Sequence, residues 1–168
     1  MSVLDKARAG QNVLEKIANA IPGFKGYRER ELRRDADKLE REHLANQLEE
    51  CKKALNDAAN TATRGGGLDV INDVETARKR LDKVIARIRF ADRGYAGFFD
   101  AVKVDEAVLE RVYEFDLGLL SNVTDIRAAA GALGSASDVK AGLGTLVAAI
   151  DVADARLADR EQILSGIR

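Results

Sequence analysis

The chain has 168 residues, 46% of them hydrophobic and only one of them proline, which fits a single domain with a substantial core. Its 27 Lys and Arg residues nearly balance 28 Asp and Glu residues, so the formal net charge is -1 and we expect no nucleic-acid partner, which would require a one-signed basic patch. The single cysteine, Cys51, excludes an intramolecular disulfide and a cysteine-based zinc site.

The first predicted element is a short amphipathic helix within residues 1–21. Its inward positions recur at heptad-like spacing: Leu4, Ala7, Gln11, Leu14, Ala18 and Ile21. One interpretation is a packing or oligomerisation helix. The other is a helix that lies on a membrane surface, although its polar face is mixed in charge rather than basic.

A long helix over residues 28–62 dominates the chain. Pro22 together with Gly23 and Gly26 separates it from the first helix. Its inward positions recur every three or four residues: Leu32, Ala36, Leu39, His43 or Leu44, Leu48, Cys51, Leu55, Ala58 and Ala62. Such a long and polar helix needs partner helices along its apolar side. We expect Cys51 to be buried there as a small hydrophobic residue.

The glycines at 65–67 predict a tight turn, and Asp69 is the predicted N-cap of the next helix. This second main helix repeats apolar residues with the same period: Val70, Val74, Ala77, Leu81, Val84 or Ile85, Ile88 and Ala91. Its outer side is basic, and we interpret that side as a solvated surface that pairs with neighbouring acids: Lys79, Arg80, Lys83, Arg87 and Arg89.

Two further helices complete the predicted bundle. The third begins at Asp105 or Glu106, where acids favour a helix start, and its inward positions are Leu109, Val112, Asp116, Leu119 or Leu120, Val123, Ile126, Ala130 and Leu133. The fourth follows a turn at residues 134–137, and its inward positions are Val139, Leu143, Leu146, Ile150, Ala153, Leu157, Ile163 or Leu164 and Ile167. Small residues on both sides of this turn predict a close approach of the two backbones.

These elements predict an all-α fold, an antiparallel four-helix bundle with an additional N-terminal helix. The whole chain, residues 1–168, forms one domain, with the N-terminal helix in residues 1–21 and the four main helices in residues 28–167. We expect a cytoplasmic protein, because the chain shows no secretory segment and no run of about 18 apolar residues.

The aromatic residues converge on one end of the predicted bundle, around the connection at residues 93–104. One interpretation is a hydrophobic cap that closes the bundle. The other is a partner-binding patch, because aromatic residues dominate the energetics of protein interfaces. The candidate partner-binding residues are Phe24, Tyr27, Arg28, Arg93, Tyr95, Phe98, Phe99 and Lys103.

One motif points toward metal chemistry. Glu40 and His43 have the Glu-x-x-His spacing that ferritin-like di-metal bundles use twice. The matching spacing on the third main helix is Glu110-x-x-Tyr113, which lacks the second histidine. Asp116 occupies an inward position, and we expect a structural polar contact near His43 rather than a direct contact between these two residues. We therefore assign no metal ligand, cofactor-binding residue or catalytic residue.

The segment IPGFKGYRERELRRDADKLEREHL, residues 21–44, resembles the opening of a group of small, uncharacterised bacterial helical proteins. The resemblance implies a bacterial cytoplasmic protein and carries no activity. We expect a non-catalytic structural or adaptor protein, not an enzyme, that binds another protein or itself through coiled-coil-like helix faces or the aromatic end. The alternatives are a peripheral membrane protein that uses the N-terminal helix and a ferritin-like metal-binding bundle.

Overall fold

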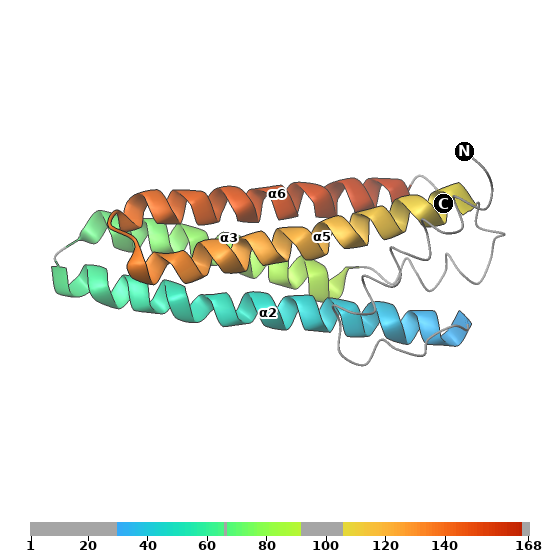
Figure 1. The fold of residues 1–168 in the computed structure, drawn as a ribbon, viewed down its shortest axis with the longest axis horizontal. Coiled ribbons are helices and arrows are strands. Elements are labelled where there is room, and N and C mark those ends of the chain that lie inside the picture. The colour runs from blue at the N-terminus through green and yellow to red at the C-terminus, as the bar shows by residue number, and fades with distance from the viewer. Residues whose placement is uncertain (1–29, 66, 92–105, 166–168) are drawn as a thin grey trace.

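The computed structural model describes residues 30–65, 67–91 and 106–165, and these residues contain helices but no strand. The four long helices are α2 (Arg30–Gly65), α3 (Leu68–Phe90), α5 (Glu106–Ala132) and α6 (Val139–Ser165) (Figure 1). A short 3-10 helix, η1 (Leu133–Ser135), precedes the turn into α6. The predicted all-α class is confirmed.

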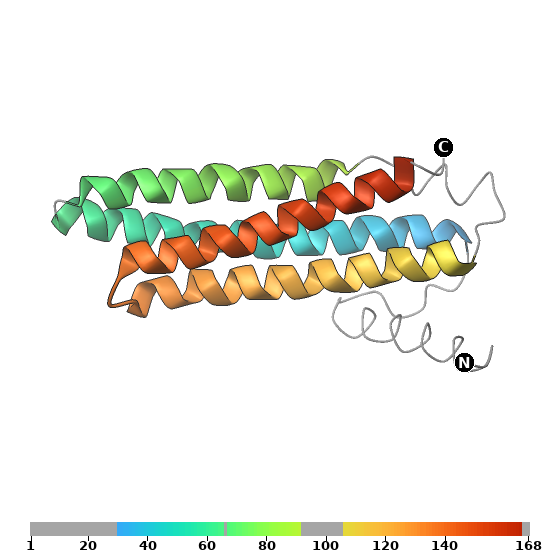
Figure 2. The same ribbon diagram turned by 90° about the horizontal axis from the view of Figure 1, so that it is seen from above.

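The helices form two hairpins that pack side by side. The first hairpin contains α2 and α3, and the second contains α5 and α6. Helix α2 packs on α5 and α3 packs on α6, so that α2 lies diagonally across the bundle from α6 (Figures 1 and 2). The two helices of each hairpin run antiparallel, whereas α2 runs parallel to α5 and α3 runs parallel to α6.

The core lies between the four helices and is almost entirely aliphatic. Its largest fully buried side chains are Leu44, Leu48, Leu55, Leu81, Ile88, Ile126, Leu143, Leu146, Ile150 and Val74. All of them occupy positions that the three-and-four periodicity of the sequence predicts. Burying a side chain of this size contributes about 1.5–3 kcal/mol, so the shared core provides the main stabilisation of the bundle.

The turns follow the predicted sites with one correction. Helix α3 begins at Leu68 and its cap is Gly67, without a side-chain hydrogen bond. The prediction that Asp69 is the N-cap is therefore wrong: the cap lies two residues earlier, and Asp69 lies inside the first turn. The backbone N–H of Gly67 donates to the carbonyl of Ala62 at 2.9 Å, which closes the end of α2.

The turn between α5 and α6 is closed by Asp138, whose carboxylate accepts a hydrogen bond from the backbone N–H of Ala141 at 3.0 Å. A Cβ atom on Gly142 would lie 3.0 Å from a methyl carbon of the Leu133 side chain, so this glycine makes room for a side chain and not for the predicted second backbone. Gly131, Gly134 and Gly144 face open space instead. The crowding is therefore confined to one position.

Candidate functional site

All eight predicted partner-binding residues lie outside the residues whose side chains the structure describes: Phe24, Tyr27, Arg28, Arg93, Tyr95, Phe98, Phe99 and Lys103. The aromatic end remains a prediction. One described residue borders it: Phe90, the last residue of α3, is 81% exposed. A large aromatic side chain in water is free to contact a partner.

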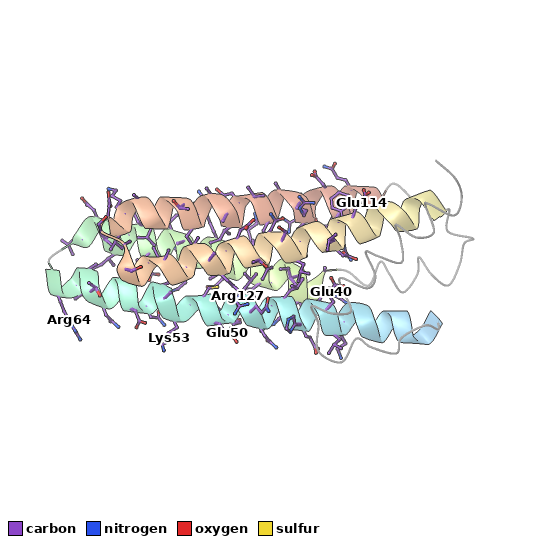
Figure 3. All side chains as sticks on the ribbon, viewed as in Figure 1. Glu40, Glu50, Lys53, Arg64, Glu114 and Arg127 are labelled. Carbon is purple, nitrogen blue, oxygen red and sulfur yellow. The ribbon has the colours of Figure 1, made fainter. Side chains whose placement is uncertain are left out.

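The inward-facing charges form a polar cluster at the end of the core near the C-terminus of α3, defined here as Glu40, Arg41, Asp116 and Arg160. Glu40, Asp116 and Arg160 are only 8%, 8% and 7% exposed. Glu40 comes from the inner side of α2 (Figure 3), and the other two come from α5 and α6.

Two contacts of the polar cluster join separate parts of the bundle. The Arg160 Nε atom lies 3.3 Å from a carboxylate oxygen of Asp116, which joins α6 to α5. Arg41 Nη1 donates to the carbonyl of Ala91 at 2.9 Å, so α2 holds the backbone just beyond α3. Because two acids face two bases, the formal charges of the cluster cancel.

A small cavity lies within the cluster, and aliphatic residues complete its wall: Leu44, Ile88, Leu119 and Leu157. Its size is about that of one water molecule. Ligand pockets for small molecules are typically about 300–1,000 Å³, so this cavity is too small to bind such a ligand. The role that these contacts support is structural: an ion pair joins α6 to α5, and a charge-assisted hydrogen bond joins α2 to the residue that follows α3.

The sequence analysis identified part of this cluster. It placed Asp116 at an inward position and singled out Glu40 for its spacing to His43. It missed Arg41 and Arg160. Arg160 could have been predicted as an inward residue, because it follows Leu157 by three residues in the three-and-four repeat of α6.

The metal motif does not assemble in the described part of the chain. His43 is half-buried, and its Nε2 atom lies 3.1 Å from Nε2 of Gln47 on the next turn of α2. The predicted polar contact of His43 is thus made to Gln47, and Asp116 forms an ion pair with Arg160. Among the described residues, no group of three or more His, Cys, Asp or Glu side chains could hold a metal ion. The side chains of Glu110 and Tyr113 lie outside that description.

The sequence predicted that the basic side of α3 pairs with neighbouring acids, and the structure places three of these pairing residues against acids of α6. Lys83 Nζ lies 2.7 Å from a carboxylate oxygen of Asp154, and Arg87 bridges Asp154 and Glu161, the latter at 2.9 Å. Arg80 pairs with Asp151. The paired residue numbers rise together along both helices, which is the pattern of parallel neighbours.

These pairs shift the ionisation of the groups involved. Burial acts to raise the pKa of Asp154, but the hydrogen bonds from Lys83 and Arg87 outweigh it, and the pKa lies below its usual range. Burial likewise acts to lower the pKa of Arg87, and the bonds to Asp154 and Glu161 reverse the effect and raise the pKa. The charged forms of these residues are therefore favoured in the folded state.

The first hairpin is held by a second group of ion pairs. Lys52 Nζ on α2 lies 2.7 Å from a carboxylate oxygen of Asp82 on α3. Hydrogen bonds to Asp82 and to Glu49 raise the pKa of Lys52. Arg89 reaches back to Glu49 at 3.1 Å. The charges on the facing edges of α2 and α3 thus neutralise one another.

Cys51 is buried, as predicted, with 6% of its surface exposed. Burial raises the pKa of its thiol, and the Sγ atom donates weakly to the carbonyl of Gln47 at 3.5 Å. A thiol in this state is a poor nucleophile at neutral pH. The side chain therefore has a packing role.

The fold and the paired charges define an all-α helical bundle with a polar cluster at one end of an aliphatic core. None of the described helices combines the length and the apolar character needed to cross a lipid bilayer. Comparison of the chain with known protein families, with curated proteins and with solved structures found no significant match.

Proposed function

We propose that this chain is a non-catalytic structural or adaptor protein whose partner is another protein or a second copy of itself. The proposal includes a cytoplasmic location and an additional N-terminal helix in residues 1–21. In this proposal the bundle is a rigid support and the aromatic end is the binding surface. The support comes from the exposure of Phe90 next to that end of the molecule.

The observation that carries the proposal is the exposure of Phe90 at the end of α3. A Phe side chain gains about 1.5–3 kcal/mol when it is fully buried, and here most of that gain remains available to a partner. Phe90 directly precedes the connection that contains Tyr95, Phe98 and Phe99 in the sequence. A partner that covers this end would bury several aromatic side chains together, which is typical of interface hot spots.

The test is an affinity pulldown of tagged full-length protein from its native cell extract, with the solution mass measured in parallel. The variants are Phe90→Ser and the double change Phe98→Ser with Phe99→Ser. We expect both variants to lose a partner that the wild type retains, while circular dichroism shows unchanged helix content.

Leu68→Ser is the matched control. Leu68 is 73% exposed at the start of α3, so this variant removes a similarly exposed large hydrophobic residue from the opposite end of the bundle. It should retain the partner. Equal loss of binding in Leu68→Ser and Phe90→Ser would contradict a specific aromatic surface, and a loss of helix content in the aromatic variants would favour the hydrophobic cap.

A further inference from the structure

The outer face of the second hairpin differs in character from the rest of the described surface. Here "outer face" means the solvent-exposed sides of α5 and α6. The middle of this face carries the charged residues Asp125 and Arg127, and beside them lie small uncharged side chains and one larger exposed hydrophobic residue: Ser121, Thr124, Ala128, Ala148, Val152 and Ala155. Val152 is 52% exposed, whereas the apolar residues on the inner side of α6 are buried in the core. Small side chains allow two helices to approach closely and pack over a large area.

Arg156 stands at the edge of this face in a fixed position. Its Nε atom donates to the side-chain carbonyl of Asn122 on α5 at 2.8 Å, and Asn122 is itself only 8% exposed. A Cβ atom on Gly118 would lie 2.1 Å from Arg156 Nη1, so the guanidinium occupies the space that this glycine leaves open. The arginine is therefore oriented before any partner arrives.

Arg156 also differs from the half-buried basic residues that join the helices. Arg87 and Lys52 pair with acids of a neighbouring helix, whereas Arg156 makes no ion pair with any residue in the described ranges. Asp125 is an exposed acid on α5 that also makes no ion pair within those ranges. One face thus presents a fixed cation and an acid, neither of which forms an ion pair within the described ranges.

The relative placement of these two charges is suited to a twofold axis. Asp125 follows Asn122 by three residues on α5, and Val152 precedes Arg156 by four residues on α6. Because α5 and α6 are antiparallel, both steps lead the same way along the bundle, and Asp125 lies near the level of Val152. A twofold axis between Asp125 and Arg156 places Asp125 of each copy opposite Arg156 of the other copy, which makes two equivalent ion pairs.

We propose that the outer face of the second hairpin binds a second copy of this chain, with Arg156 of each copy paired to Asp125 of the other and Val152 near the axis. This inference rests on the proposed interaction function and names the partner and the surface. Like charges placed directly opposite each other cost several kcal/mol at an interface. The pairing can therefore be tested by charge exchange.

The experiment measures the solution mass of full-length protein by sedimentation equilibrium. The wild type should dimerise, and Arg156→Glu and Asp125→Lys should each weaken dimerisation about tenfold or more. An equimolar mixture of the two variants should regain the dimer, because both cross-pairs then have opposite charges. A mixture that stays monomeric overturns the inference.

Two further variants complete the design. Gly118→Ala displaces the guanidinium without changing any charge, and it should weaken the dimer at unchanged helix content. Lys53→Glu is the charge control: Lys53 is an exposed base without an ion pair in the described ranges, and it lies on the outer side of α2 (Figure 3). This variant should dimerise as the wild type does.

The remaining outcomes separate this inference from the proposed function. A monomeric wild type overturns the inference, while a foreign partner that depends on Phe90 would leave the proposed function intact. A dimer whose affinity is unchanged by every substitution at Arg156 and Asp125 also overturns the inference. In that case self-association remains the proposed function, and it uses another surface.

Discussion

Arg160 and Asp116 show how a single buried charge acts in this core. Each is almost completely withdrawn from water, so each has lost its hydration. The attraction between the two charges offsets the cost of losing their hydration, so the intact ion pair contributes little net stability. Removing one partner is different, because the other charge then stays in the core without this ion pair.

We predict that Arg160→Met lowers the free energy of unfolding by about 3 kcal/mol. The methionine fills a similar space, so the loss reports the charge rather than a cavity. Urea unfolding followed by circular dichroism measures the change. The double variant Asp116→Leu with Arg160→Met should regain most of the loss, and a single variant that costs less than about 1 kcal/mol would show that the pair is not desolvated.

Cys51 provides a second prediction at the same scale. Its burial and raised thiol pKa both slow attack by a thiol reagent at neutral pH. We predict that the thiol reacts with Ellman's reagent at least about tenfold more slowly in the native protein than in urea. Equal rates in the two conditions would mean that α2 is open around this residue.

At the scale of the elements, the contact between α3 and α6 depends on charge as well as on the core. Asp154 receives both Lys83 and Arg87, and Arg87 continues to Glu161. A carboxylate that bridges two bases on a parallel neighbour holds both the distance and the register of the two helices. Networks of this kind are more stabilising than isolated surface pairs.

The lowered pKa of Asp154 sets the direction of a pH effect. The unfolded carboxyl titrates near pH 3.9, and the folded one titrates at lower pH. Its contribution is therefore fully present above about pH 4 and disappears as the pH falls through the folded-state pKa. We predict that Asp154→Asn lowers stability at pH 7 by about 1 kcal/mol, and that the difference from the wild type shrinks below about pH 4.

Asp159→Asn is the matched control for this prediction. Asp159 is an exposed acid of the same helix that makes no ion pair within the described ranges. Urea unfolding from pH 3 to pH 7 should give the wild-type curve for this control. A difference between Asp154→Asn and the wild type that stays constant across this range would contradict the assigned titration.

At the scale of the whole molecule, the two hairpins share one core. Residues of α2, α3, α5 and α6 all contribute to the same buried cluster, which includes Leu48, Leu81, Ile126 and Leu146. Separating the hairpins would expose apolar surface on both of them. We therefore expect the described bundle to unfold as one cooperative unit.

We predict that Leu146→Ala on α6 lowers stability by about 2–5 kcal/mol, because Leu146 is completely buried. The same variant should expose Cys51 on α2 at a correspondingly lower urea concentration. Loss of helix content and reaction of the Cys51 thiol are the two measurements. A thiol transition that stays at the wild-type midpoint would show that the hairpins unfold separately.

Within the described residues, sequence periodicity was sufficient to predict the four long helices and the core positions of their largest buried side chains. Leu48, Leu81 and Ile150 were assigned to the core correctly, because a repeat of three and four is a local property of one helix. The glycine turn was placed for the same reason, although its cap proved to be Gly67 rather than Asp69. The aromatic end was derived from the sequence and lies largely outside the described residues.

Only the tertiary structure decided how the two hairpins pack on each other and which charges meet. The pairing of Asp116 with Arg160 joins residues far apart in the chain, and so does the fit of Arg156 over Gly118. Periodicity shows that a residue points inward, but its partner depends on which helix lies opposite and at what level. That choice arises from the packing of two hairpins into one core, which a local pattern does not specify.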